Sequence, residues 1–392
     1  MEKRYIRLKE LTPNLKRFRS VPEVYYLNRP KLQRGLTYFQ EADNDGYLIS
    51  GNYNTSGKKI FLMGGSTIEN IFSQCDSRIN YILEEELLKN NYNYSVLNTA
   101  ISGGTLLHIF NVIINKIASL KDSTIILTVP SNDLHALKMK KSYWNGHKDF
   151  GNIVPVSGKE DKNDTIENNL RHQIAMLNAI NEFCKAFGIK LLMTGIIHNE
   201  EKSEYKKINN LVKEWCLEKS VPYLKLSEFL SQKDELFYDD LHFNSYGAEI
   251  AGRELFKLIS PYLDHQDVLF NQFIIGEKID LDDKTYWSNY IDVTEKSILS
   301  LWINTKSSKK VSYNSALYVV EYDREVSPEE CGLTKSGIGL YEYLKLQDDG
   351  LNACQHLQIK IPKNVKRMRV GVKKWQKAAQ IFLNKAFLNK IN

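Results

Sequence analysis

The chain has 392 residues, of which 42% are hydrophobic and 26% charged, as is ordinary for a globular protein that can bury a sizeable core. Its five cysteines are far apart and include no CxxC pair, which argues against a disulfide framework and a cysteine-ligated zinc site. No apolar run is long enough to span a bilayer, and the charged N-terminal stretch lacks the apolar segment of a secretory signal. We therefore expect a cytoplasmic protein with two main domains.

Residues 1–57 are rich in tyrosine, asparagine and glycine, and we expect an N-terminal extension of loops and short strands lying over the core. From 58 to 262, short apolar strands alternate with amphipathic helices. This alternation is typical of a parallel sheet covered by helices on both faces. The predicted strands are 59–63, 94–98, 124–129, 189–194 and 221–226, and the predicted helices are 73–90, 106–120, 170–187, 203–219 and 245–259.

A polar stretch, 138–169, interrupts this alternation. It holds Trp144, His147 and several glycines between a strand and a helix. An irregular segment of this length is usually either a functional lid or disordered, and the sequence leaves both interpretations open.

The fold class changes after residue 262. Strand-length segments rich in aromatic and β-branched residues follow, separated by Asn, Asp, Gly, Ser and Pro. They predict an all-β sandwich over 267–375, for which carbohydrate binding is a candidate role because such modules often stack sugars on exposed rings. The segments are 297–304, 316–322, 338–346, 356–361 and 368–372.

The C-terminal tail is strongly basic, with nine Lys and Arg and no Asp or Glu from Lys363 onward. We predict a basic helix over 376–392 whose apolar side packs on the sandwich. The alternative is contact with an acidic partner or a membrane surface, which would make the protein peripheral at the inner membrane face. Nucleic-acid binding is not expected, because no recognised binding motif accompanies the charge.

The turn Gly64-Gly65-Ser66 directly follows the first strand of the alternating region. A serine placed there presents its hydroxyl beside the N–H groups of a helix N-terminus, which stabilise an anion. The purely structural interpretation is a glycine turn with Ser66 capping a helix. Two other predicted strands end at Ser102-Gly103-Gly104 and Ser131-Asn132-Asp133, and ligands bind at the carboxyl ends of parallel strands. This convergence favours Ser66 as a nucleophile.

The segment 237–247, FYDDLHFNSYG, supplies an acid and a base. Asp239 stands three residues before His242, so its carboxylate can fix the tautomer of that imidazole and stabilise its positive form. His242 is then free to take a proton from a serine. The neighbouring Asp240 is the competing choice for the acid.

Four blocks now stand in order: GGST at 64–67, NTAISGG at 98–104, SND at 131–133 and DDLH at 239–242. Over about 58–259 the chain thereby resembles the SGNH (GDSL) hydrolase superfamily, serine esterases and acyl-processing enzymes with a flavodoxin-like α/β/α fold. The resemblance implies Ser66 as nucleophile, Asp239 and His242 as its partners, and an oxyanion hole made by the N–H groups of Ser66 and Gly103 and the amide of Asn132.

Two departures from the family pattern leave the substrate open. Gly65 stands where the family usually has aspartate, and Ser131 where it usually has glycine. Neither change removes a reacting group, but both alter the surroundings of the nucleophile and the oxyanion.

The expected function is ester hydrolysis through an acyl-enzyme on an O-acylated, carbohydrate substrate. One alternative is an O-acyltransferase (acetyltransferase) that modifies a bacterial surface polysaccharide or its precursor, and another is a non-catalytic glycan-binding protein. Hydrolysis and acyl transfer use the same reacting groups, so the sequence does not separate them. We find no metal-ligand cluster, P-loop or dinucleotide fingerprint in the sequence and expect no cofactor.

Overall fold

The computed structural model describes residues 5–391 except 30, 33, 49–57, 74, 91, 121, 148–150, 152, 155–163, 201, 265–268, 275–278, 283, 295–297, 312–315, 345–351 and 376–379. The chain forms two compact units. The first ends at Leu263, and the second begins at Asp264 and also includes Leu87–Asn93.

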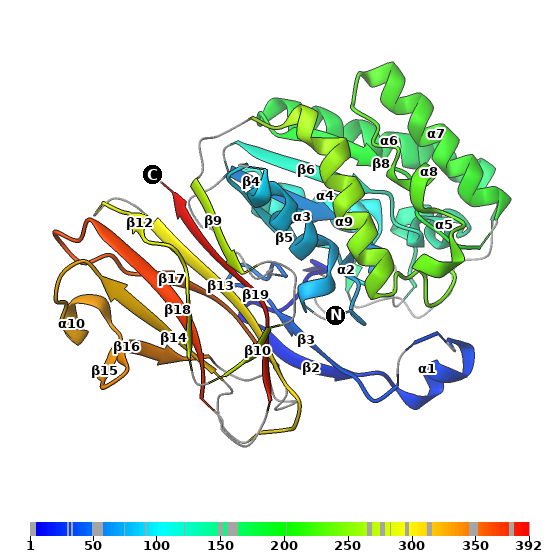
Figure 1. Ribbon diagram of the computed structural model, residues 1–392. Helices are drawn as coiled ribbons and strands as arrows, with labels where there is room; N and C mark the ends of the chain where they lie inside the picture. Colours follow the sequence, from blue (N-terminus) through cyan, green and yellow to red (C-terminus); the bar gives the residue numbers. More distant parts are fainter. Residues whose placement is uncertain are drawn as a thin grey trace. The chain divides into compact units, whose positions relative to one another are not determined.

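The first unit is built on a four-stranded parallel sheet, which confirms the predicted fold class (Figure 1). The strand order is β5 (Tyr94–Asn98), β4 (Lys58–Met63), β6 (Ser123–Thr128) and β8 (Lys190–Thr194). Every residue of β5 and β6 is buried. Burial on both faces is consistent with the short apolar stretches in these strands, Val96–Leu97 in β5 and Ile125–Leu127 in β6, because helices cover the sheet on each side.

The helices around this sheet include α7 and α9, whose bounds are those predicted from the spacing of their apolar residues. None of the helices in the described part of the chain combines the length and the apolar character needed to cross a membrane. The helices of residues 5–263 are α1 (Glu23–Asn28), α2 (Ser66–Glu69), α3 (Ile79–Lys89), α4 (Leu106–Val112), α5 (Asn132–Leu137), α6 (Ile166–Ala186), α7 (Ser203–Lys219), α8 (Leu226–Leu230) and α9 (Ser245–Ile259).

The predicted fifth strand, 221–226, is wrong. Tyr223 makes a single parallel bridge to Met193, and α8 begins three residues later at Leu226. Pro222 has no N–H to donate, so its carbonyl alone takes part, accepting from the N–H of Met193. The segment therefore pairs at one point and then turns into a helix.

The N-terminal residues are part of the first unit as far as they are described, up to Leu48. Strands β2 (Lys16–Ser20) and β3 (Thr37–Glu41) pair antiparallel on either side of α1, and a short pair joins β1 (Tyr5–Ile6) to β7 (Ile153–Val154). Tyr26 and Tyr38 pack in one apolar cluster with Phe72 and Tyr238. This packing brings the N-terminal segment against the residue that precedes Asp239.

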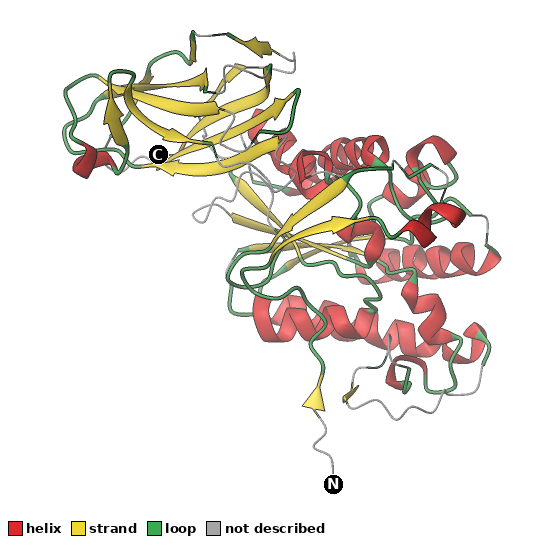
Figure 2. Cartoon of the chain, turned by 90° about the horizontal axis from the view of Figure 1, so that it is seen from below, coloured by secondary structure: helices red, strands yellow, loops and turns green. Residues whose placement is uncertain are grey.

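The second unit consists of two antiparallel sheets, as predicted (Figure 2). One sheet has the order β10–β19–β13–β17 with β9 on β19, and the other has the order β11–β18–β14–β16–β15 with β12 on β18. Alternate residues of both sheets, among them Leu301, Val320 and Val370, form one core. The strands are β9 (Leu269–Ile274), β10 (Ile279–Leu281), β11 (Thr285–Trp287), β12 (Ile291–Asp292), β13 (Ile298–Ser307), β14 (Ala316–Tyr322), β15 (Thr334–Ser336), β16 (Gly339–Tyr343), β17 (Asn352–Ile359), β18 (Arg367–Lys374) and β19 (Ile381–Ile391).

The predicted basic helix over 376–392 is wrong. Ile381–Ile391 is strand β19, which pairs with β13 from Ile298 to Ser307. Ile381 and Leu383 are fully buried. The apolar residues of this segment have helical spacing, but the segment forms a strand because it pairs with a long neighbouring strand. Tertiary contacts of this kind outweigh the intrinsic secondary-structure propensity of a short segment. Residues 376–379 lie outside the described part of the chain.

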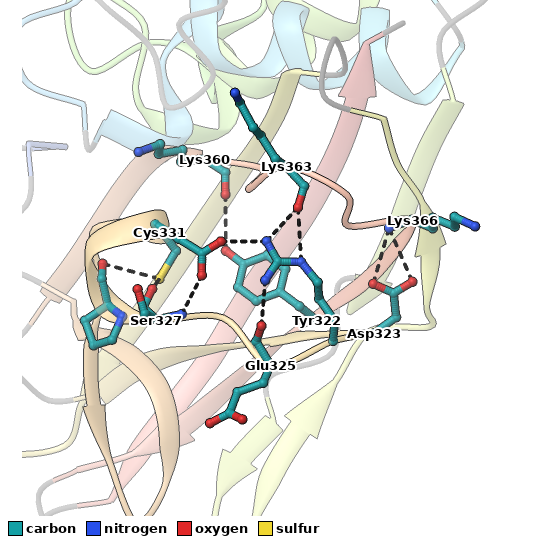
Figure 3. Close-up of polar contacts among 11 residues, drawn as sticks. Tyr322, Asp323, Glu325, Ser327, Cys331, Lys360, Lys363 and Lys366 are labelled. Carbon is teal, nitrogen blue, oxygen red and sulfur yellow. Dashed lines mark hydrogen bonds and ion pairs between the residues drawn. The ribbon is translucent and has the colours of Figure 1, made fainter.

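A polar network holds the chain where it leaves β14 for the short helix α10 (Pro328–Cys331) (Figure 3). The Asp323 carboxylate accepts hydrogen bonds from the backbone N–H groups of Lys366 and Arg367. The Arg324 guanidinium donates to the carbonyl of Lys363 and to the Glu330 carboxylate at 2.6 Å. Backbone groups at this end of the sheet are thereby satisfied by side chains.

Candidate active site

Ser66 lies at the junction of β4 and α2, where the sequence predicted it. A Cβ added to Gly64 would lie 2.8 Å from Cγ1 of Ile68, so the turn requires glycine at that position. Helix α2 ends after one turn because Asn70 adopts the left-handed conformation (φ 48°). The serine hydroxyl is partly exposed at the carboxyl end of the strand.

The imidazole of His242 bonds Ser66 on one side and Asp239 on the other. Nε2 lies 2.8 Å from Oγ of Ser66, and Nδ1 lies 2.8 Å from Oδ2 of Asp239. The ring of Tyr238 stacks on the imidazole at 5.5 Å with an interplanar angle of 10°. The ring is therefore held in the orientation in which a histidine can take a proton from a hydroxyl.

Asp239, rather than the competing Asp240, contacts the imidazole. Its Oδ1 also accepts from the N–H groups of Leu241 and His242 at 2.9 and 2.8 Å, and its Oδ2 accepts from Nε of Arg29 at 2.7 Å. Burial alone would raise the pKa of Asp239, but the hydrogen bond and charge of His242 and the bonds from Leu241 and Arg29 place that pKa well below its usual range. The side chain of Asp240 is exposed.

Arg29 is a residue that the sequence did not indicate. It directly follows α1 and lies 210 residues before Asp239 in the chain. Its guanidinium lies 4.5 Å from the centre of the Tyr25 ring, a cation–π contact that orients it. An arginine in an irregular segment, with no fixed spacing to the acid it binds, carries no signal that sequence reasoning can use.

The three predicted oxyanion donors have no hydrogen-bond partner among the residues that the structure describes. Nδ2 of Asn132 is buried without a hydrogen-bond partner among the described residues, and a Cβ on Gly65 would lie 3.2 Å from it. Gly103 has a left-handed backbone (φ 74°), and neither its N–H nor that of Ser66 bonds another described residue. Unpaired donors are what a developing oxyanion needs. Glycine at 65, in place of the family's usual aspartate, leaves room for the Asn132 amide.

Glu69, at the end of α2, holds the loop that carries Gly103. Its carboxylate is 2% exposed, and Oε2 accepts from both the N–H and the hydroxyl of Ser102, each at 2.6 Å. Its Oε1 faces Nε2 of Gln40 at 3.4 Å and the guanidinium of Arg17 at 3.7 Å. One carboxylate thus joins the helix of Ser66, the Gly103 loop and strands β2 and β3.

Asp133 connects the Gly103 loop to the helix of Asn132. It is fully buried, with Oδ1 accepting from the N–H of Leu106 at 3.0 Å and Oδ2 accepting from the hydroxyl of Tyr143 at 2.7 Å. Burial raises the pKa of Asp133 to about 7, even though these hydrogen bonds lower it. Its acceptors fix the start of α4 relative to the start of α5.

The polar stretch 138–169, for which the sequence leaves a lid and a disordered segment open, is described in part. Helix α6 begins at Ile166, inside the stretch, and 148–150, 152 and 155–163 lie outside the described residues. Trp144 is 53% exposed and meets His172 edge to face at 5.6 Å. Among the residues that the structure describes, no three His, Cys, Asp or Glu side chains are grouped so that they could hold a metal ion.

A family model described as GDSL-like Lipase/Acylhydrolase matches residues 60–255. Solved structures with similar folds include an acetyl xylan esterase, AlAXEase, at 11% identity over 51% of this chain and 98% of that chain, with a TM-score of 0.37. A lipase/acylhydrolase from Enterococcus faecalis is 15% identical over 54% of this chain and 99% of that chain, with a TM-score of 0.39. A GDSL-like lipase from Bacteroides thetaiotaomicron is 13% identical over 54% of this chain and 92% of that chain, with a TM-score of 0.38. Curated protein sequences show no match to this chain.

The raised pKa of Asp133 predicts how stability depends on pH. An aspartate has a pKa of about 3.9 when unfolded, so the neutral, buried carboxyl stabilises the fold fully below pH 4, and this contribution is lost as the pH rises toward 7. The unfolding free energy of the wild type should fall relative to Asp133→Asn by on the order of 1.4 kcal/mol per pH unit in that window. Urea unfolding at several pH values measures this difference.

The surface variant Asp240→Asn controls for the loss of one negative charge. Wild-type and Asp133→Asn stabilities that run parallel from pH 4 to 7 would contradict the assignment of a neutral, buried Asp133.

Proposed function

The chain belongs to the GDSL-like lipase/acylhydrolase family, and on that premise we propose that it is a serine-dependent ester hydrolase acting on an O-acylated carbohydrate. The observation that carries the proposal is the hydrogen-bonded chain from Asp239 through His242 to Ser66. A serine hydroxyl is a weak nucleophile by itself and needs an adjacent base held by a third group. These three side chains, with Asp239 rather than Asp240 as the acid, are proposed to supply that arrangement.

In the proposed first step, Oγ of Ser66 attacks the ester carbonyl while Nε2 of His242 takes its proton. The carbonyl oxygen becomes an oxyanion and accepts hydrogen bonds from the N–H groups of Ser66 and Gly103 and from Nδ2 of Asn132. A donor of this kind is typically worth about 3–4 kcal/mol in the transition state. Asp239 stabilises the positive imidazolium without taking its proton.

In the second step, the bond between the acyl carbon and the alcohol oxygen breaks, and the alcohol leaves with the proton from His242. The acyl group remains on Ser66 as an ester. A water molecule, deprotonated by His242, then attacks the acyl carbon. The bond between that carbon and Oγ of Ser66 breaks, the acid leaves, and Ser66 takes back its proton from His242. If a sugar hydroxyl takes the place of water, the same groups transfer the acyl group, which is the alternative function.

The carbohydrate part of the proposal is supported by exposed aromatic rings. Trp375, in the second unit, is 44% exposed and meets Tyr343 edge to face at 5.1 Å. Trp144, beside α5, is more exposed still. An exposed indole offers an apolar surface and a polar N–H, which together suit stacking on a sugar ring.

The test of the nucleophile is Ser66→Ala. We expect the turnover of a small acetyl ester to fall by at least about 10³-fold, because the remaining groups can only bind and polarise the ester. Ser245→Ala, at the exposed start of α9, is the matched control and should keep full activity. Full turnover by Ser66→Ala would contradict the proposal, because catalysis would then not pass through an ester on Ser66, whereas no turnover by the wild type would favour a non-catalytic glycan-binding protein. Mass spectrometry of the products, with a sugar acceptor present, separates free acid from an acylated sugar and so hydrolysis from acyl transfer.

Arg29→Met should lower kcat for the same ester about tenfold or more with little change in KM. The variant removes a charge-assisted hydrogen bond to Asp239, which is typically worth roughly 1.5–3 kcal/mol, so the acid is held less firmly behind His242. Arg34→Met, which removes an exposed guanidinium from the same segment, is the control. Equal effects of the two substitutions on kcat would show that Arg29 acts only by supporting the fold.

Glu69→Ala should lower kcat by up to about 100-fold, because a small displacement of the Gly103 N–H weakens its bond to the oxyanion. Glu69→Gln keeps a carbonyl oxygen that can accept from Ser102 and should restore most of the activity. Steady-state kinetics on both variants, with their unfolding midpoints, check this. A kcat for Glu69→Ala equal to that of the wild type would remove Glu69 from the positioning of the site.

A further inference from the structure

We infer that a basic groove beside the proposed active site binds an anionic stretch of the glycan whose ester reaches Ser66, an inference that rests on the proposed function. The groove, called here the α7 groove, has a volume of about 760 Å³ and is lined along one side by residues of α7. The residues on which the argument depends are Lys202, Lys206, Asn210, Lys213, Glu228 and Gln232.

One face of α7 forms a long wall of the α7 groove. This wall carries four polar side chains at intervals of four, four and three residues, which places them on the same side of the helix: Lys202, Lys206, Asn210 and Lys213. At 1.5 Å per residue, this face extends over about 16 Å. The opposite wall comes from α8 and the residues that follow it. A groove of this length suits an extended ligand better than a compact one.

The near end of the groove adjoins the loop of the proposed catalytic acid and base. The N–H of Asn199 donates to the carbonyl of Asp240 at 2.7 Å, one residue from Asp239. The pKa of Lys202 is raised by its hydrogen bond to Glu200 and also by the charge of Asp240, so its ammonium lies near that loop. The same ammonium helps to lower the pKa of His135 on α5, after burial and Lys138. Lys202 thus lies near both the His242 loop and the helix of Asn132.

The charges in the groove are only partly compensated. Lys213 pairs with Glu228 at 2.7 Å, and Lys202 pairs with Glu200 at 2.5 Å. Lys206 lies between them and is exposed, and its ammonium has no hydrogen bond or ion pair with any other described residue. The middle of the groove therefore carries a positive charge that no acidic side chain of the described chain neutralises.

Two carboxamides beside Lys206 are also unpaired. The side chains of Asn210 and Gln232 have no partner among the described residues. Gln232 adopts the left-handed backbone (φ 61°), unusual for a residue with a long side chain, and its N–H is held by the carbonyl of His198 at 2.9 Å. Carboxamides both donate to and accept from sugar hydroxyls, and an ammonium binds a carboxylate or phosphate as a point charge.

The composition of the groove selects among ligands. None of the described residues that line it is aliphatic, so a lipid chain would gain little by entering. A neutral glycan would use the carboxamides but leave the charge of Lys206 unused. An oligosaccharide with carboxylate or phosphate groups would use both, and its binding would weaken with salt.

Calorimetric titration of the wild-type protein with three probes tests this inference: tetragalacturonate, a glycerol-phosphate oligomer and the neutral cellotetraose. We expect one of the two anionic probes to bind at least about tenfold more tightly than cellotetraose at low salt, and to lose this advantage in high salt. Tighter binding of tetragalacturonate would identify carboxylate as the recognised group, and tighter binding of the glycerol-phosphate oligomer would identify phosphate.

Lys206→Glu should weaken binding of that probe about tenfold and leave the turnover of a small neutral acetyl ester unchanged. Lys219→Glu, at the far end of the same helix, is the matched control and should bind as the wild type does. Equal affinity for the three probes, or no effect of Lys206→Glu, would overturn the inference. Ester turnover that persists in Ser66→Ala would instead overturn the proposed function.

Discussion

The carboxylate of Asp239 is the group on which the rest of the active-site geometry depends. It accepts hydrogen bonds from two backbone N–H groups of its own loop, from His242 and from Arg29. These donors are divided between its two oxygens, so a rotation of the carboxylate would break several of the hydrogen bonds at once. That orientation fixes the imidazole, and the imidazole in turn lies against the hydroxyl of Ser66.

Two further buried acidic side chains hold the loops of the oxyanion donors. Glu69 binds the backbone beside Gly103, and Asp133 binds the start of α4 while lying next to Asn132 in the chain. Donors fixed before a reaction need no reorganisation when charge develops, which is why a rigid frame favours catalysis. Burying an acidic side chain costs free energy unless it is hydrogen-bonded. Here the hydrogen-bond donors to each acid belong to the loops that the acid holds in place.

Local signals in the sequence account for much of the first unit. The spacing of apolar residues predicts α7 and α9, because one face of each is buried, and short apolar runs predict β4 and β6. The interval between Asp239 and His242 predicts their contact, since three residues suffice to bring the side chains together.

The features that the sequence did not indicate depend on partners far away in the chain. The run IFLNKAFLNKI at 381–391 suits a helix or a strand, and its pairing with β13 decides between them. The role of Arg29 depends on a contact across 210 residues, and that of Glu69 on the loop at Ser102. In the same way, Pro222 limits 221–226 to one bridge although its apolar residues favour a strand.

The most direct test of the account is a crystal structure of the protein after reaction with an alkyl phosphonate ester, a stable mimic of the tetrahedral intermediate. The account predicts a covalent bond between phosphorus and Oγ of Ser66, with a phosphoryl oxygen about 2.7–3.1 Å from Nδ2 of Asn132 and from the N–H of Gly103. A protein that does not react, an adduct on another residue, or a phosphoryl oxygen turned away from both donors would contradict it.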